Sequence, residues 1–492
     1  MKRNNKLKYL AGALLLGTSL VSCKKYLDLA PEDATYDQVF WSTGDNVDKA
    51  ISGAYGLIRT AFRDTRSYFT LGDLPADEFL LDAGTFWNYQ DLLSTKQYHY
   101  SYAPYLEDAL HNWTRFYGII NQCHLIVENG EKIPVAKYKG GQEQKNAFVG
   151  EGHFLRAYTY FYLTKVWGEP VITRESLKNP TDVQPIPRST DQEALEYCIS
   201  DLKKAAALLG FNKGTTSARI RADKGAAWAM LAHVYAWKRD FATAKLYCDS
   251  VIERGGYTLE PMSSYANIWK GASGESILEL FMKYDAANQS ESSAGFFGDF
   301  LADPLIRNKG INTSWRVNED LFNQLYDPAD LRAQQVFTTV LGESLLTKYA
   351  NVNYFDPNRP NTYVVDNNLV LLRLSDIHLL RAEALFEEGN ATAALSDMNV
   401  IRQRAGLDPL TVPADLTIDE IYDERVRELY GEGQVAFDKI RMLITNPDKR
   451  SALPEPYTTE RVDKKGYNWP LAMRKLLPQN VLLTQNEWWK NH

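Results

Sequence analysis

The sequence predicts a mainly α-helical protein. Eight long stretches carry apolar side chains at every third or fourth position, which is the spacing of one face of an α-helix. Thr190 and Glu193 have the spacing of a capping box that begins a helix, and Gly255 and Gly406 follow stretches that end there. The sequence does not show the alternation of strands and helices that would indicate a doubly wound sheet. In chain order the stretches are residues 45–62, 110–129, 150–167, 191–209, 222–254, 374–405, 418–430 and 434–443.

Two of these stretches share the register of a tetratricopeptide repeat, in which two antiparallel helices meet at small residues twelve positions apart. The register comprises Trp228, Leu231, Ala232, Tyr235, Ala244, Cys248 and Val251, and again Ala382, Leu385, Ala394, Met398 and Ile401. A third copy begins at His153, Arg156, Ala157 and Tyr160, and its second helix is expected at residues 191–209. The alternative is an ordinary packed helical hairpin, which shows small residues at similar spacings. We predict a scaffold of helical pairs with large irregular insertions at about residues 63–109 and 257–361.

The N-terminus has the pattern of a lipoprotein signal peptide. Four basic residues precede an apolar run at residues 10–20, which is too short to span a bilayer of roughly 30 Å. The run ends in Leu20-Val21-Ser22-Cys23, which looks like a lipobox. We expect residues 1–22 to be removed, Cys23 to be lipidated, and residues 23–492 to form a single body. The alternative is an ordinary signal peptide with a coincidental cysteine.

Composition excludes several classes of function. Loss of the four basic residues before Cys23 takes the formal net charge of the chain from -7 to -11. Nucleic-acid binding requires clustered basic side chains, so an acidic body argues against it. Cys123, Cys198 and Cys248 are odd in number and lie among apolar residues, so buried free thiols are expected.

A series of short motifs recurs in a fixed order along the chain. They are residues 23–28, 40–43, 50–55, 117–123, 151–158, 167–170, 186–188, 374–377, 381–384, 424–429 and 437–441. Together they resemble the SusD/RagB family of outer-membrane nutrient-binding lipoproteins. One departure is Gln434, where the family often has a basic residue; we interpret that position as one that serves packing.

The resemblance implies a location and partners. It implies a lipid anchor in the outer membrane facing the cell surface, and a SusC-like TonB-dependent transporter over which the lipoprotein sits. It also implies a glycan ligand most often, and a peptide in some members. No cofactor or metal is implied, and an adventitious calcium ion on loop carboxylates is unpredictable.

The insertions contain the candidate ligand-binding residues. Sugars stack on aromatic faces while amides and carboxylates bond their hydroxyl groups. The candidates are Trp87, Asn88, Tyr89 and Gln90 in the first insertion and Tyr284, Phe296, Phe297 and Trp315 in the second. The competing interpretation is that each ring packs its loop onto the body.

Acidic residues near the C-terminus could be mistaken for a glycosidase pair. Glu424 and Glu428 share one helix face, but Arg425, Arg427 and Arg441 accompany them, which favours a structural ion-pair network. Residues 431–436 match the letters of a dinucleotide-binding pattern, but they follow a predicted helix. A dinucleotide-binding site requires this pattern after a strand, so the match does not indicate such a site. We therefore expect a binding protein without catalytic residues. The alternatives are a peptide binder of the same family, a surface glycoside hydrolase and a pure adaptor.

Overall fold

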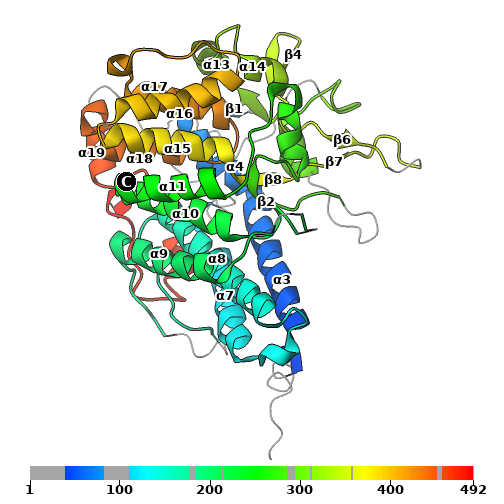
Figure 1. Cartoon of the computed structure of the whole chain (residues 1–492), viewed down its shortest axis with the longest axis vertical. Helices are drawn as coiled ribbons and strands as arrows, with labels where there is room; N and C mark the ends of the chain where they lie inside the picture. The colour runs from blue at the N-terminus through cyan, green and yellow to red at the C-terminus, as the bar shows by residue number, and fades with distance from the viewer. Residues whose placement is uncertain are drawn as a thin grey trace, which may run out of the picture.

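The computed structural model describes residues 39–81, 110–177, 184–212, 214–215, 217–284, 294–310, 313–355, 358–450 and 457–490. Its long helices are α3 (Gly44–Arg63), α7 (Thr114–Lys132), α8 (Gly141–Trp167), α9 (Asp191–Leu208), α10 (Lys224–Trp237), α11 (Phe241–Arg254), α15 (Leu374–Glu387), α16 (Ala391–Arg404), α17 (Ile418–Leu429) and α18 (Val435–Thr445). Helices α7 to α11 and α15 to α17 lie in successive layers, and α3 packs against α7 and α8 (Figure 1). The predicted mainly helical fold is confirmed.

Helix ends follow from local chemistry. Thr190 and Glu193 form the expected capping box at the start of α9. The long stretches 222–254 and 374–405 each break into an antiparallel pair, and the second break contains Gly389 at φ +78°. Helix α8 begins nine residues before the predicted position 150. Its first turns are polar, so apolar periodicity does not reveal them, but Lys145 ties them to the end of α7 through two backbone carbonyls.

The helical pairs meet at the small residues that the repeat register predicts. Ala232 and Ala244 are fully buried where α10 packs on α11, and Ala382 and Ala394 are fully buried where α15 packs on α16. A side chain without atoms beyond Cβ lets the two backbones approach closely. The third pair consists of α8 and α9, as expected for the displaced second helix.

The same polar contact occurs between the two helices of two of these pairs. On α8, His153 and Arg156 both bind Asp201 of α9, at 2.8 and 2.7 Å. On α15, His378 and Arg381 bind Asp397 of α16 in the same arrangement, at 3.0 and 2.7 Å. Equivalent contacts in separate parts of the chain support a repeated helical unit.

Short strands and short helices form the insertions. Four two-stranded antiparallel sheets are present in the described residues. They pair β1 (Phe79–Leu81) with β3 (Trp315–Val317), β2 (Ser276–Leu280) with β8 (Leu369–Arg373), β4 (Phe337–Val340) with β5 (Glu343–Leu346), and β6 (Val352–Asn353) with β7 (Val364–Val365). Between them lie η3 (Asp64–Arg66), α4 (Ser67–Gly72), η4 (Leu74–Ala76), η9 (Met262–Lys270), α12 (Ala294–Phe297), η10 (Gly298–Phe300), α13 (Glu319–Leu325) and α14 (Leu331–Val336). The hairpin of β6 and β7 projects from one side of the molecule (Figure 1).

A large hydrophobic core joins helices and insertions, with side chains from Val47 to Leu483, and a second cluster of buried side chains packs α15, α16, α17 and α18 together. The three cysteines after Cys23 are buried free thiols within the helices, as predicted. Burial raises the pKa of each, and to about 12 for Cys123, which keeps these thiols protonated and unreactive. No helix in the described ranges is long and apolar enough to cross a bilayer.

Candidate functional site

An exposed pair of aromatic rings marks the second insertion. The rings of Tyr284 and Phe355 are stacked, with centroids 5.9 Å apart and an angle of 14° between their planes. The Phe355 side chain is 55% exposed and Tyr284 is partly exposed. Because a large apolar ring contributes little to folding when it faces water, a stacked pair at the surface indicates a binding surface.

Polar groups contact Tyr354, the residue that precedes Phe355. Arg307 lies over the ring of Tyr354 at 4.3 Å, and its backbone N–H donates to the Tyr354 hydroxyl at 2.8 Å. Asn308 donates to Asn361 at 3.1 Å, and both side chains are exposed. We call Tyr284, Arg307, Asn308, Tyr354, Phe355 and Asn361 the hairpin platform. It combines flat apolar faces with amide and guanidinium donors, as the recognition of polyhydroxylated ligands requires.

A largely buried corner at residues 366–368 positions both sides of the platform. Asp366 accepts a hydrogen bond from the Tyr284 backbone N–H at 3.1 Å. Asn367 accepts from the Asn351 backbone N–H at 3.1 Å, just before β6. Asn368 accepts from the Met282 backbone N–H at 3.1 Å. The corner therefore fixes the segment that carries Tyr284 against the hairpin that carries Phe355.

Three of the predicted ligand-binding residues lie in the core. Phe296, Phe297 and Trp315 are 1%, 0% and 2% exposed. Phe297 stacks on Tyr349 at 4.4 Å, and Trp315 stacks on Phe300 at 5.7 Å. The expectation that these three rings face an open groove is therefore corrected, because their faces are covered by other rings. Their polar sequence neighbours suggested exposure, but short-range sequence does not show what packs above a loop.

The remaining predicted residues divide into two groups. Tyr284 is in the hairpin platform, whereas Trp87, Asn88, Tyr89 and Gln90 lie outside the described residues. Sequence reasoning missed Tyr354 and Phe355, although both fall within the predicted insertion. The signal was present, since two adjacent aromatic residues follow Asn353 in a segment rich in Asn and Pro.

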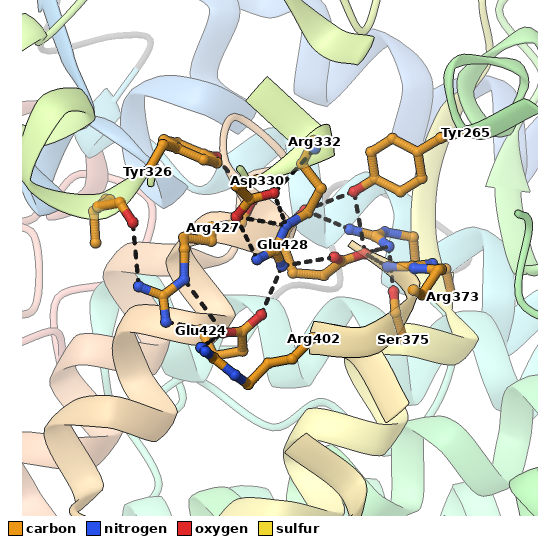
Figure 2. Close-up of polar contacts among 12 residues, drawn as sticks. Tyr265, Tyr326, Asp330, Arg332, Arg373, Ser375, Arg402, Glu424, Arg427 and Glu428 are labelled. Atoms are coloured by element: carbon orange, nitrogen blue, oxygen red, sulfur yellow. Dashed lines mark hydrogen bonds and ion pairs between the residues drawn. The ribbon is translucent and has the colours of Figure 1, made fainter. Parts of the chain in front are cut away.

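The acidic residues of α17 form the expected structural ion-pair network. Arg332 binds Glu424 at 2.7 Å and Glu428 at 3.2 Å, and Arg373 binds Glu428 at 2.5 Å. Figure 2 shows Glu428 between these two guanidinium groups, with Arg427 on the far side of Glu424. The side chains of Arg332, Glu424 and Glu428 are completely buried, so the network joins α14, β8 and α17 inside the protein.

The protonation states of this network do not match acid–base catalysis. Burial alone would raise the pKa of Glu424, but Arg332 and Arg427 outweigh it and hold that pKa below its ordinary value. The pKa of Glu428 is held well below its usual range, because Arg404, Arg373 and Arg332 outweigh burial. A glycosidase needs one carboxyl group with a raised pKa facing a cleft. Glu424 and Glu428 provide neither. In the described part of the chain, no three His, Cys, Asp or Glu side chains are grouped closely enough to hold a metal ion.

Two family models match this chain. One is described as the SusD family and matches residues 310–484. The other is described as "Starch-binding associating with outer membrane" and matches residues 25–236. The two ranges do not overlap and together include more than half of the chain. The helical pairs, the irregular insertions and these matches agree, and the chain belongs to the SusD/RagB family.

Individual relatives match over nearly their whole length. A SusD-like protein of Formosa agariphila is 26% identical, and the match covers 95% of this chain and 96% of that protein. The starch-binding protein SusD of Bacteroides thetaiotaomicron is 23% identical, with 88% and 89% covered. A crystal structure of a SusD superfamily protein from Bacteroides thetaiotaomicron has a TM-score of 0.74 at 24% identity, covering 91% of this chain and 99% of that one. NanU of B. fragilis has a TM-score of 0.70 at 17% identity, covering 93% and 99%.

Proposed function

We propose that this protein is a surface-exposed outer-membrane lipoprotein that binds oligosaccharides and delivers them to a SusC-like TonB-dependent transporter. Membership of the SusD/RagB family supports the class. The name of one family model and that of the Bacteroides thetaiotaomicron relative both refer to starch binding. The lipobox at Cys23 supports an acyl anchor, which needs several chains for stable attachment.

The single observation that carries glycan binding is the exposed stack of Tyr284 and Phe355. Nothing in the described residues covers the outer part of Phe355, which is 55% exposed. A sugar ring placed on this stack would remove apolar surface from water on both partners, and the nearby amides would bond its hydroxyl groups. We also propose Trp87, Asn88, Tyr89 and Gln90 as ligand contacts, because that segment offers the same combination of aromatic rings and amides.

Calorimetric titration with a panel of neutral and acidic oligosaccharides tests this proposal. Phe355→Ala and Tyr284→Ala should each weaken binding at least tenfold and leave the melting temperature nearly unchanged. Phe211→Ala is the matched control, because Phe211 is also exposed and contacts another ring, that of Trp228. Normal affinity in both platform variants would contradict the placement of the site. If the protein binds peptides and none of the oligosaccharides, a peptide replaces the glycan as the proposed ligand. Release of shorter sugars during the titration would indicate a hydrolase.

A further inference from the structure

A small cavity lies apart from the hairpin platform, where α8, α10, β8 and the turn before α18 meet. Its volume is about 20 Å³, enough for one body the size of a water molecule or a small ion. Lys165, Tyr162, Gln434, Tyr68, Tyr158 and His233 contribute polar side chains to its lining, and Phe161 and Met230 supply apolar walls. No residue of the hairpin platform lines it.

Lys165 places a positive charge at this cavity. Its ammonium group lies 4.3 Å from the ring centroid of Phe437 and 5.1 Å from that of Phe161. Within the described ranges the ammonium group contacts these two rings, and no carboxylate pairs with it. Burial lowers the pKa of Lys165 to about 8, although the residue is still partly exposed to solvent.

The two carboxylates that favour the charged form of Lys165 are bound by other groups. Asp376 accepts from His233 at 2.7 Å and from Arg425 at 2.8 Å. Asp438 pairs with Arg425 and with Arg441, each at 2.8 Å. Both carboxylates favour the charged form of Lys165 from a distance, whereas Arg441 opposes it. Neither is available as a direct partner of the ammonium group.

The other polar groups at the cavity have hydrogen atoms to donate. The Tyr162 side chain is 4% exposed, and its hydroxyl has no hydrogen-bond partner in the described structure. Gln434 uses one N–H of its amide to reach the Leu371 carbonyl at 3.0 Å and has a second N–H to offer. An ammonium group has three donors and no acceptor capacity. The positive charge of Lys165 favours an anion over a neutral water molecule at this cavity, and the Tyr162 hydroxyl and the Gln434 amide can donate hydrogen bonds to it.

We propose that this cavity binds a monovalent anion of chloride size, held by the Lys165 ammonium, the Tyr162 hydroxyl and the Gln434 amide. The bound anion supplies the counter-charge that Lys165 lacks and joins α8 to the turn before α18. It acts on stability, so it is independent of the ligand proposed at the hairpin platform. A ligand that binds only the native state stabilises it increasingly with concentration.

Thermal unfolding in sodium chloride and in sodium gluconate at equal ionic strength tests the site on the full mature chain. The parent protein should melt at a higher temperature in chloride, with a saturable dependence on its concentration, and bromide should act similarly. Lys165→Met should weaken the apparent halide affinity at least tenfold, and Tyr162→Phe should weaken it severalfold. Lys132→Met is the matched control, because Lys132 is an exposed lysine at the end of α7 and its loss should change nothing.

Crystals of the parent protein soaked in sodium bromide give an independent readout that needs no variant. An anomalous scattering peak within hydrogen-bond distance of Lys165 Nζ and Tyr162 Oη is expected. A cavity without such a peak would mean that it holds only water, and the proposal would be wrong. Equal melting temperatures in chloride and gluconate, or a halide effect that Lys165→Met retains in full, would overturn it as well.

Discussion

Trp315→Ala should destabilise the protein and leave its ligand affinity nearly unchanged. The Trp315 side chain is 2% exposed and stacks on Phe300, and the edge of Phe79 meets it at 5.7 Å. It lies in β3, which pairs with β1 and so joins the second insertion to the first. Its removal therefore leaves a cavity in the aromatic core and takes no exposed face away from a ligand.

The expected magnitude follows from burial. A buried tryptophan removes roughly 150–250 Å² from water. At about 25 cal/mol per Å² this corresponds to about 4–6 kcal/mol, and measured aromatic truncations in cores cost about 3–5 kcal/mol. A chain of 492 residues has an unfolding entropy of about 1 kcal/mol/K, so the melting temperature should fall by about 3–5 °C if the body unfolds as one unit.

Thermal melts and denaturant titrations of Trp315→Ala, the parent and Phe355→Ala measure this effect. Phe355→Ala is the informative comparison, because its ring is exposed and its loss should cost less than about 1 kcal/mol. Calorimetry with the same oligosaccharide should then show weak binding for Phe355→Ala and near-parent binding for Trp315→Ala. The opposite pattern, with a stable Trp315→Ala that has lost its ligand, would refute this reasoning.

Three further predictions concern other parts of the chain. Cys23→Ala should give a folded protein that no longer partitions into membranes, and firm attachment in a strain without the transporter would contradict the lipid anchor. Ala232→Trp should destabilise the body by more than about 1–3 kcal/mol, because the fully buried Ala232 lies at the contact of α10 with α11, and an unchanged melt would count against that contact. Burial raises the pKa of Asp73 from 3.8 to about 8 and also raises that of Glu78, which is coupled to it, so the native pair holds a proton that the unfolded chain releases. Stability should therefore decrease as pH rises from about 4 to about 8, and replacing both acids of the pair, by Asp73→Asn with Glu78→Gln, should flatten that decrease in denaturant titrations.

The helical scaffold was predictable because its signals are local. Apolar periodicity and capping residues lie within a few positions of each other, so they gave the long helices and most of their ends. The small residues Ala232 and Ala382 also indicated the pairing of helices, since close backbone approach requires them. The polar start of α8 was missed because an exposed helical turn without apolar spacing has no such signal.

The candidate site was less predictable because exposure depends on distant parts of the chain. Trp315 and Phe355 have similar polar surroundings in sequence, yet the first is covered by Phe300 and Phe79 and the second faces water. The arginines beside Glu424 in the sequence predicted that a structural ion-pair network would form there. Its main partner, Arg332, comes from another insertion element about ninety residues earlier, which no local pattern reveals.

The largely buried corner at residues 366–368 connects the scaffold to the hairpin platform. It follows β7 and leads directly into β8, whose last residue, Arg373, is held in the ion-pair network by Glu428. The same corner fixes the backbone of Tyr284 and of Asn351 through its side chains. The stacked rings are therefore positioned before any ligand arrives, and binding need not order them at the cost of conformational entropy. Because the ring-bearing residues lie beyond the corner, exchange of Phe355 or its neighbours changes the ligand surface while the ion pairs and the helical pairs stay intact.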